Sequence, residues 1–500
     1  MTRAGTVDLA LILPERPRGA LAFRWLCSTL REAILDGRLR PGTQLPASRD
    51  LAARCHVSRG TVVATFDQMK VEGYLSARVG SGTFVNTTLP DSLLSVVRGA
   101  NAPRMLHAPR PRRLSALGRR VRPFPSPSPQ RTRAFRANLP ALDLFPTTLW
   151  AQVAGRRLRR ASVDMLRGCD AMGYEPLRRA IADYLYTARG VTCQAAQIAI
   201  VSGVQEALDL CAQLFLDPGD RVAIEEPGYI GAALAFEAHG ARLCSLPLDS
   251  EGAVVPDSRS RDVRLVYVTP AHQFPVGISM SLGRRLALIE WARRSGALIF
   301  EDDYDSEFRY AGAPVPAMQG LDRDGVVLFA GSFSKVLFPS MRLGYLVVPD
   351  DLVDRVSALK SVSRKFEPLL EQAVLADFIA DGHFGRHVRR MREVYAVRLA
   401  VLIERAQRSL DGLLDISDVE AGLQTVGWLR DSLNGADVAK AAADRAVEVI
   451  PVSRYARRPA PREGLLLGFA AVDEREIERG VRELAIAIER CRKSTATRRR

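Results

Sequence analysis

A single lysine, Lys335, lies among small and apolar neighbours in the stretch GSFSKVLFPSMRLGY, residues 331–345. A lysine amine can condense with an aldehyde to form a Schiff base. Ser332, Ser334 and Arg342 belong to the same stretch and offer hydroxyl groups and a guanidinium fork to an anion. Taken alone, Lys335 is better interpreted as a surface lysine, so the chemical interpretation depends on other loops.

Four other loops carry groups that complement this lysine. Gly203 and Val204 open a predicted helix, whose first N–H groups suit a phosphate. Tyr229 offers a ring that can stack on a planar ligand, and Asp302 offers a carboxylate for a protonated ring nitrogen. Pyridoxal 5′-phosphate (PLP) has these parts, so we predict a PLP site with Lys335 as the Schiff-base lysine. A helix cap is the plainer alternative for Asp302, and a packed turn aromatic for Tyr229.

The elements that must position these loops alternate between strands and helices from about residue 135 onward. The helical stretches include EALDLCAQLF and RRLALIEWARR. This alternation predicts an open, largely parallel α/β sheet, and such sheets gather ligands at the carboxyl ends of their strands. The strand-like runs that precede the loops are residues 197–201, 221–225, 263–268, 297–301, 326–330 and 342–348.

The N-terminal part, residues 15–86, has a different pattern. Apolar residues recur at helical spacing in residues 19–36, and two short helical stretches follow at 48–55 and 58–73. Ser48 and Ser58 are the expected N-caps of these two helices. Residues 74–86 alternate like a two-stranded ribbon around a Gly-Ser-Gly turn. Three helices and a hairpin predict a winged helix-turn-helix.

Charge is distributed unevenly along the 500 residues, whose total net charge is +15. Residues 1–135 carry +14, residues 136–489 about −5 and residues 490–500 +6. Only the N-terminal part is therefore expected to bind a polyanion such as DNA. Residues 87–134, rich in Pro, Ser and Arg, are predicted to form a solvated linker, with contact to DNA phosphates as the alternative. The basic tail, residues 490–500, is expected to be disordered.

The remaining composition favours a cytoplasmic protein. Seven scattered cysteines without a CxxC pair are typical of a reducing compartment, and no apolar run is long enough to span a bilayer. His383 and His387 are four residues apart, a spacing that can bind metal. Their flanks are basic and no third ligand is evident, so we predict a solvated helix and no metal.

Five segments in order, SGVQEAL, EEPGY, PAHQFPVG, EDDYDSEF and SFSKVLFPSMRLGY, resemble fold-type I aminotransferases. With the GntR-like winged helix of residues 15–86, the chain resembles the MocR family of transcription regulators. The resemblance implies an aminotransferase-like domain at residues 135–489, with a large α/β domain and a smaller C-terminal α/β subdomain. It also implies that Tyr304 lies near the ring hydroxyl of PLP, and that His272 or Gln273 contacts the same hydroxyl.

The resemblance further implies a homodimer that binds double-stranded DNA and responds to an amine, an amino acid or PLP itself. An active aminotransferase with an accessory DNA-binding domain is the alternative, and an empty dimerisation scaffold is a second one. The residues that match DNA-contacting positions of GntR-like proteins are Ser58, Arg49, Arg59 and Thr61, with Gly80, Ser81 and Gly82 at the tip of the wing.

Three positions depart from the aminotransferase pattern. Phe274 stands where an asparagine is usual, and Gly168 where a tyrosine usually reaches the phosphate of the neighbouring subunit. Leu466 replaces the arginine that clamps a substrate carboxylate, so Arg454 or Arg462 is a candidate substitute. These departures argue against efficient transamination and leave open an effector that is not an ordinary α-amino acid.

Overall fold

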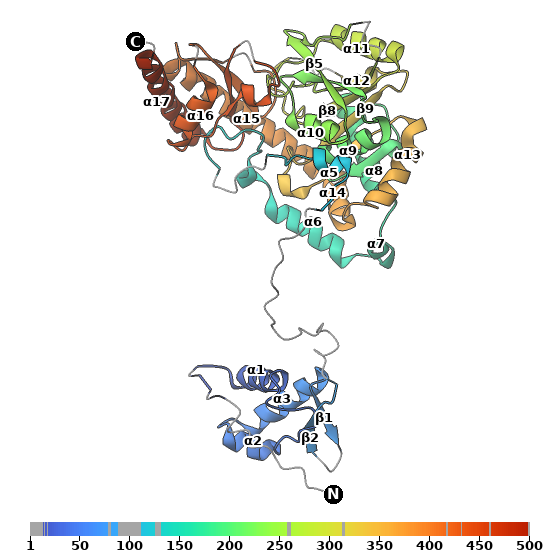
Figure 1. Ribbon diagram of the computed structural model, residues 1–500, viewed down its shortest axis with the longest axis vertical. Coiled ribbons are helices and arrows are strands. Elements are labelled where there is room, and N and C mark those ends of the chain that lie inside the picture. Colours follow the sequence, from blue (N-terminus) through green and yellow to red (C-terminus); the bar gives the residue numbers. More distant parts are fainter. Residues whose placement is uncertain are drawn as a thin grey trace. The chain divides into compact units, whose positions relative to one another are not determined.

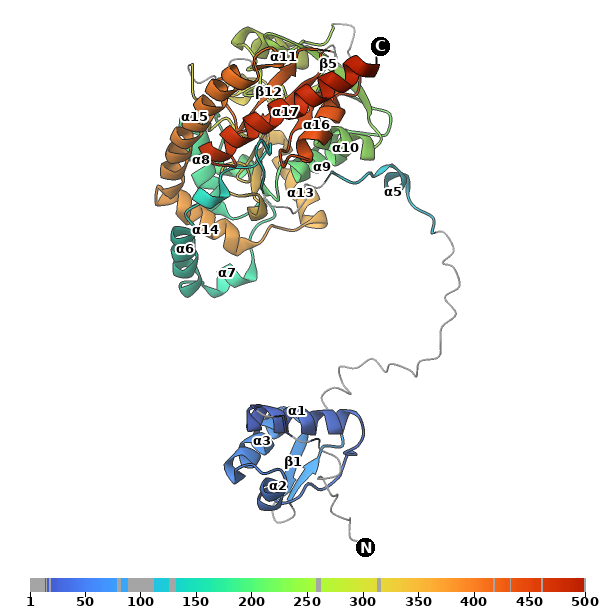
Figure 2. The same cartoon turned by 90° about the vertical axis from the view of Figure 1, so that its left-hand side faces the viewer.

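The computed structural model divides into two compact units, Met1–Arg112 and Arg113–Arg500, and each is treated by itself (Figures 1 and 2). The residues it describes are 14, 16–17, 19–78, 82–88, 112–125, 132–257, 262–312, 316–416, 419–431, 433–459 and 462–498.

The first unit has the predicted order of a winged helix-turn-helix. Helices α1 (Ala22–Leu35), α2 (Ser48–Arg54) and α3 (Arg59–Val71) are followed by the antiparallel pair β1 (Leu75–Arg78) and β2 (Gly82–Val85). Every third or fourth residue of these helices is apolar, which gives each helix a face that packs into one core. The largest contributors to this core are Leu26, Leu30, Leu51, Val62, Phe66 and Met69.

The two predicted N-caps have different outcomes. The Ser58 hydroxyl accepts a hydrogen bond from the backbone N–H of Thr61, so Ser58 caps α3 as predicted. The prediction for Ser48 is wrong: α2 begins one residue earlier than expected, and Ala47 occupies its N-cap without a side-chain hydrogen bond. A serine can cap only from the residue before the first helical one, so a shift of one position removes the bond.

The second unit is built on an eight-stranded sheet, with strands in the order β3-β10-β9-β8-β7-β4-β5-β6. Neighbours from β9 through β5 are parallel, whereas β10 and β6 run antiparallel to their partners, as the predicted mostly parallel sheet requires. The bounds are β3 Ile198–Val201, β4 Arg221–Glu226, β5 Arg242–Asp249, β6 Gly252–Ala253, β7 Val263–Val268, β8 Leu298–Asp303, β9 Val327–Ser332 and β10 Gly344–Val347.

Helices pack on this sheet and bury its apolar side chains in separate clusters. Helices α9, α10 and α13 contribute to a core with Ile224, Phe300 and Leu328, and α11 packs near Val266 and Ile299. The bounds are α6 Thr147–Arg159, α7 Val163–Arg167, α8 Glu175–Arg189, α9 Val204–Phe215, α10 Ile230–Ala238, α11 Leu282–Ser295, α12 Met318–Leu321, α13 Val353–Ser363 and α14 Leu369–Ala380.

A smaller C-terminal α/β part follows, as the resemblance implied. Its four-stranded antiparallel sheet has the order β11-β12-β14-β13. The long helices α15 and α17 pack together beside it. The bounds are β11 Leu414–Ile416, β12 Gln424–Leu429, β13 Ile450–Pro451, β14 Gly464–Gly468, α15 His383–Ser409, α16 Gly435–Ala443 and α17 Glu474–Arg498.

Two charged segments are more ordered than the composition suggested. Helix α17 continues through Arg498, so the expectation of disorder is wrong for residues 490–498. Within the predicted linker, a short helix α5 (Ala116–Arg120) forms and packs against α10. The net charge of these two segments predicted that they would be solvated. In the structure they instead make polar and apolar contacts with neighbouring elements.

The presence of a side-chain cap on α3 but not on α2 leads to a prediction about the stability of these helices. Ser58→Ala removes the hydrogen bond to Thr61 N–H and should destabilise α3 by about 1 kcal/mol. Hydrogen exchange of residues 59–66 in the full chain measures this loss. Ser48→Ala is the matched control and should leave α2 within about 0.5 kcal/mol, because Ser48 makes no capping bond. Equal effects of the two substitutions would contradict the assignment of the caps.

Candidate active site

Lys335 lies in a turn directly after β9, and its side chain is largely buried. Its Nζ donates a hydrogen bond of 2.8 Å to the backbone carbonyl of Asn138, a residue far away in sequence. Burial lowers the pKa of Lys335 to about 8, while the carboxylates of Asp305 and Asp302 act in the opposite direction. A much larger fraction of this amine is therefore neutral and nucleophilic near pH 8 than for an ordinary lysine.

Asp302 lies at the end of β8, in register with Ala330 of β9. It was expected in the loop after the strand, but the strand extends through Asp303. Its Oδ2 accepts a hydrogen bond of 2.6 Å from the Tyr267 hydroxyl, and its buried Oδ1 has no partner among the described residues. Burial raises the pKa of Asp302 to about 7. This carboxylate therefore has one oxygen available for a cationic donor.

A hydrogen-bonded row of three side chains lies beside this pair. The Tyr304 hydroxyl is 3.0 Å from Nδ1 of His272, and the same nitrogen lies 3.1 Å from Oδ2 of the buried Asp305. Both contacts involve the same nitrogen, so a protonated Nδ1 donates to Asp305 and shares its hydrogen with the Tyr304 oxygen, which places the Tyr304 hydroxyl beside the imidazole. The structure thus brings Tyr304 and His272 together. It adds Asp305, whose only signal in the sequence is the acidic run EDDYD.

Gln273, expected at the same place as His272, is occupied elsewhere. Its Nε2 donates to the backbone carbonyls of Pro227 and Phe274 and to the carboxylate of Glu225. Its Oε1 accepts from the N–H of Val276. Gln273 therefore fixes the loop after β7 onto the loop after β4, and His272 is the better candidate for contact with the cofactor.

The predicted anion cradle forms at the start of α9. Gly203 is the N-cap of this helix with φ of +125°, and the guanidinium of Arg342 lies close to it. Arg342 has no hydrogen bond or ion pair with the described residues, and the buried Ser334 hydroxyl has no partner among them either. The Ser332 hydroxyl accepts from Ser334 N–H at 3.2 Å. A helix N-terminus and a free guanidinium suit a phosphate.

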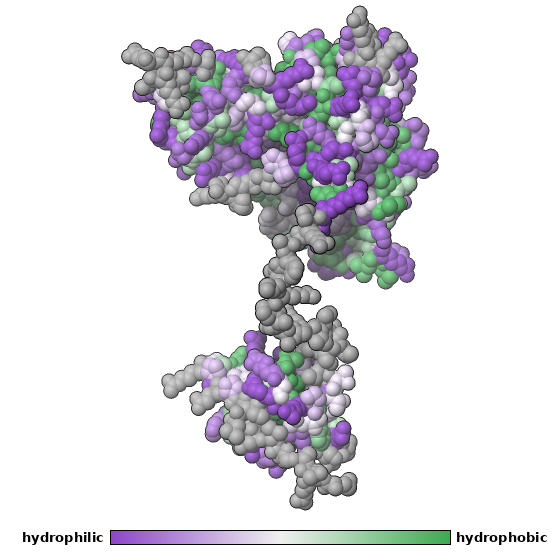
Figure 3. All heavy atoms as spheres, viewed as in Figure 1, coloured by the Kyte–Doolittle hydropathy of each residue, from purple (hydrophilic) through white to green (hydrophobic). Residues whose placement is uncertain are grey.

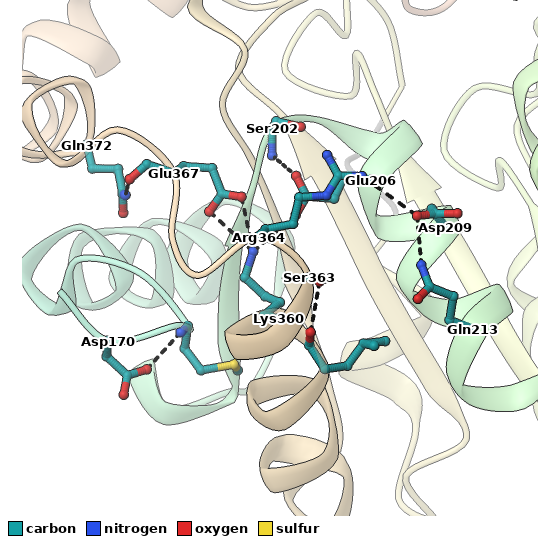
Figure 4. Close-up of polar contacts among 12 residues, drawn as sticks. Asp170, Ser202, Glu206, Asp209, Gln213, Lys360, Ser363, Arg364, Glu367 and Gln372 are labelled. Carbon is teal, nitrogen blue, oxygen red and sulfur yellow. Dashed lines mark hydrogen bonds and ion pairs between the residues drawn. The ribbon is translucent and has the colours of Figure 1, made fainter. Parts of the chain in front are cut away.

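A buried ion network supports this helix start (Figure 4). Glu206, in the first turn of α9, accepts a hydrogen bond from Ser202 N–H at 2.8 Å. Lys360 of α13 is fully buried and lies 3.1 Å from both Glu206 and Glu367. Lys360 thereby compensates the negative charge of Glu206, which would otherwise repel a phosphate at the same helix end. The sequence carried no signal for this network, because its members come from three separate segments.

Tyr229, the N-cap residue of α10, lies within an aromatic cluster. Its ring is 6.4 Å from that of Tyr267, nearly parallel to it, and 5.9 Å from Phe274. Its hydroxyl is 3.5 Å from Oε1 of Gln205. Tyr267 was not singled out from the sequence, although it connects the stacking candidate Tyr229 with Asp302. An alternating strand does not reveal which of its side chains reaches the site.

The C-terminal sheet contributes an apolar cluster beside the candidate site residues, and we call this cluster the apolar wall. Leu466 is fully buried and packs with Phe274, Val426 and Val452. The clamp candidate Arg462 is unsuitable, because it forms an ion pair with Asp415 in the small sheet. Arg454 is exposed and has no ion pair with the described residues. Leu466, at the position of the usual arginine, thus lies in an apolar cluster with Phe274, and Arg454 stays the only clamp candidate of the two without an ion pair among the described residues.

The DNA-contact candidates lie on the helices of the first unit. Arg49 on α2 and Arg59 on α3 are exposed, and neither pairs with a carboxylate of the described residues. The Thr61 hydroxyl lies 2.8 Å from that of Ser58. Gly82 begins β2, whereas Gly80 and Ser81 lie outside the described residues. Two unpaired guanidinium groups at the starts of adjacent helices suit phosphate contact.

The two histidines at the start of α15 have different surroundings. His387 is buried, and its Nε2 contacts the backbone carbonyl of Val336, so the prediction of a solvated helix is wrong for this residue. His383 contacts Arg386 instead. No group of three potential metal ligands occurs in the described residues. None of the helices described is long and apolar enough to cross a membrane.

Comparison with protein families matches both units. Residues 26–85 match the family described as bacterial regulatory proteins, gntR family, and residues 141–484 match aminotransferase class I and II. The fold and the site thus define a GntR-type winged helix joined to a fold-type I aminotransferase-like domain. Proteins of this aminotransferase class depend on PLP.

Full-length relatives share this arrangement. The probable rhizopine catabolism regulatory protein MocR of Rhizobium meliloti is 39% identical, over 95% of this chain and 96% of the relative. The HTH-type pyridoxine biosynthesis transcriptional regulator PdxR of Corynebacterium glutamicum is 31% identical, over 93% and 95%. The chain belongs to the MocR family of GntR-type transcriptional regulators.

Solved structures of aminotransferases resemble the second unit. Pyrococcus horikoshii kynurenine aminotransferase is 27% identical with a TM-score of 0.66, and covers 71% of this chain and 90% of its own. LysN, the α-aminoadipate aminotransferase of Thermus thermophilus complexed with N-(5′-phosphopyridoxyl)-L-leucine, is 27% identical with a TM-score of 0.65, covering 72% and 92%.

The residues of this chain fit PLP. The free Oδ1 of Asp302 suits a protonated pyridine nitrogen, and the unpartnered groups of Ser334 and Arg342 suit the phosphate. The amine of Lys335 has the lowered pKa that Schiff-base chemistry requires. The buried Asp302 Oδ1 and Ser334 hydroxyl, which have no partner among the described residues, thus each match a part of the cofactor.

The buried carboxylate of Asp302 should lower the stability of the second unit while it strengthens the binding of PLP. The pKa of Asp302 is raised in the folded protein, so folding loses stability as pH rises from about 4 to 7. Without cofactor, Asp302→Asn should therefore stabilise the second unit by roughly 1–3 kcal/mol at pH 8 and by less at pH 5. It should also weaken PLP binding. Urea unfolding at the two pH values and an absorbance titration with PLP measure these effects.

Asp303→Asn is the matched control. The neighbouring Asp303 is equally buried, but its Oδ2 accepts a hydrogen bond of 2.7 Å from Arg189. Its substitution should destabilise the unit at both pH values, because it leaves a buried guanidinium without its counter-charge. A loss of stability in Asp302→Asn at pH 8 would contradict the assignment of Asp302 as an unpaired buried carboxylate.

The lowered pKa of Lys335 predicts the pH dependence of cofactor attachment. Only the neutral amine attacks an aldehyde, so the rate constant should rise with pH and level off above about 8. An ordinary lysine would continue to gain rate up to its usual pKa of 10.5. Stopped-flow absorbance after mixing with PLP measures the profile. A rate that still rises steeply between pH 9 and 10 would contradict this prediction.

Proposed function

We propose that this chain is a DNA-binding transcription regulator that holds PLP as a Schiff base on Lys335 and responds to a small amine. The observation that carries the proposal is the burial of Lys335 and Asp302 at the ends of β9 and β8, with the pKa of each moved toward neutrality and with Asp302 Oδ1 unpaired. When bound, PLP would supply an aldehyde carbon at which an incoming amine can replace the amine of Lys335, which is then released.

Each site residue then has a proposed role. Asp302 holds the ring nitrogen and is itself held by Tyr267, while Tyr304, oriented by His272, donates to the ring hydroxyl. Tyr229 stacks on the ring. The phosphate is bound by the N–H groups at the start of α9, by the serine hydroxyls and by the guanidinium: Gly203, Val204, Ser332, Ser334 and Arg342.

The apolar wall supports a particular class of effector. An α-carboxylate needs a cation nearby, but Leu466 and Phe274 pack together and Arg462 is paired with Asp415. Arg454, the remaining candidate cation, is exposed rather than buried in this apolar cluster. Of the candidates considered from the sequence, an amine without an α-carboxylate fits this wall better than an ordinary amino acid. PLP itself needs no such cation and is the other effector that fits. The same wall argues against efficient turnover of amino acids.

A homodimer is part of the proposal. Helices α6 and α7 expose Leu158, Val163 and Leu166, and Figure 3 shows hydrophobic residues on the face near α7. A second copy of the chain would cover these side chains.

Gly168 caps α7 with φ of +119°, and a Cβ there would lie 2.5 Å from Phe366 Cζ. The tyrosine usual at this position therefore cannot be accommodated without moving Phe366.

Double-stranded DNA is the proposed partner of the first unit, and the cytoplasm is the proposed compartment. Two copies of a winged helix in a dimer would bind two half-sites of an operator. Arg49 and Arg59 would neutralise phosphates, while Ser58 and Thr61 lie at the start of α3, the expected recognition helix.

Cofactor attachment is tested by reduction and mass mapping. After incubation with PLP and borohydride, the pyridoxyl group should be found on Lys335, because this amine has the lowered pKa and the adjacent Asp302. Lys335→Ala should abolish the visible Schiff-base absorption band. Lys365→Ala, an exposed lysine, is the control and should keep it. Labelling at another lysine would refute the proposed site.

Electrostatic DNA binding is tested through salt dependence. Removing one phosphate contact by Arg59→Ala should reduce the slope of log K against log salt by about 1. Arg31→Ala is the control: Arg31 is in the same unit but forms an ion pair of 2.6 Å with Glu72, so its loss should leave the slope unchanged. Fluorescence anisotropy with a labelled duplex at several salt concentrations provides the slopes. Equal slopes for wild type and Arg59→Ala would exclude this contact.

A further inference from the structure

Residues 113–125, a part of the predicted linker that we name the strap, are attached to the second unit along helix α10 (Figure 2). At one end of the helix, Nε of Arg120 donates a hydrogen bond of 3.0 Å to the carbonyl of Ala238, the last residue of α10. Next to it, Arg122 forms an ion pair with Glu237.

At the other end of α10, the strap reaches the proposed cofactor site. The ring of Phe124 lies 6.2 Å from that of Tyr229, the N-cap residue of the helix. The strap therefore runs antiparallel to α10, with Arg120 at its C-terminal end and Phe124 at its N-terminal end. Three contacts of different kinds hold it: a hydrogen bond to a helix carbonyl, an ion pair and an aromatic contact.

A continuous row of contacts connects the strap with Asp302. Phe124 touches Tyr229, whose ring lies 6.4 Å from that of Tyr267 and nearly parallel to it. The Tyr267 hydroxyl donates to Asp302 Oδ2 at 2.6 Å. Any ligand that places a ring against Tyr229 and a cation against Asp302 contacts two of the four members of this row, and Tyr229 is the member that contacts Phe124. Phe124 itself is 47% exposed, so it can adjust without disturbing a core.

We infer that the strap couples occupancy of the Lys335 site to the linker, with Phe124 as the residue that positions Tyr229. The inference rests on the proposed function, because it takes Tyr229 as the stacking residue. A ligand that fixes Tyr229 favours the attached strap, and by thermodynamic linkage the attached strap favours that ligand by the same factor. When the strap is held on α10, fewer residues connect the two units than when the strap is released. The length of this connection sets the effective concentration of the DNA-binding unit at its DNA site.

Phe124→Ala in the full chain tests the coupling. An aromatic contact of this kind should change the dissociation constant for PLP by about twofold to tenfold toward weaker binding. Val121→Ala is the matched control, because Val121 lies in the same strap, is 57% exposed and makes no ring contact. Its dissociation constant should equal that of the wild type. Absorbance titration with PLP gives all three values, and circular dichroism verifies that the variants are folded.

Hydrogen exchange on the wild-type chain provides a measurement that needs no variant. Saturation with PLP should slow exchange of amides in residues 118–125, and Phe124→Ala should remove this protection while its Schiff-base band remains. Arg120→Ala, which releases the other end of the strap, should weaken PLP binding in the same direction.

The outcomes separate the two proposals. If the wild type forms the Schiff-base band but strap exchange is unchanged, and Phe124→Ala binds PLP as Val121→Ala does, the inference is overturned and the proposed function stands. If the wild type forms no such band, the proposed function fails and the inference fails with it.

Discussion

The structure depends on the burial of an amine and a carboxylate, Lys335 and Asp302, at the carboxyl ends of neighbouring parallel strands without an ion pair between them. Burial disfavours both charges, and it moves both pKa values toward neutrality. A stable core would pair or remove such groups. Their persistence is understandable if a cofactor satisfies them, because it offers a carbonyl carbon to one and a cationic nitrogen to the other.

The surrounding residues keep this arrangement in place. Lys360, buried between Glu206 and Glu367, balances the charge at the helix start where the phosphate is proposed to bind. Nδ1 of His272 contacts both Asp305 and Tyr304. Gln273 joins two loops through its side-chain amide. The candidate site residues are therefore held by a surrounding set of hydrogen-bonded side chains.

A regulator and an enzyme can share this scaffold, because the difference lies in what surrounds the aldehyde. Phe274 and Leu466 share an apolar cluster at the positions where the aminotransferase pattern has polar groups. The strap along α10 connects the aromatic cluster with the linker. A ligand that changes a contact between two segments of the protein can shift its conformational equilibrium, which is what a sensor requires.

The sequence by itself determined the winged helix-turn-helix, the mostly parallel sheet and the order of the loops along the chain, because periodicity and turn residues are local and parallel strands bring their ends together. The roles of Lys335, Asp302, Tyr229 and Arg342 stay predictions. Only the tertiary structure decided which neighbours satisfy these groups. Tyr267, Lys360 and the strap were not predicted, the cap at Ser48 was placed one residue off, and Arg462 proved to be paired elsewhere. Tyr267 and Asp302 are 35 residues apart, and Lys360 and Glu206 are 154 apart. Partners this far apart leave no local pattern, so their pairing emerges only when the chain packs.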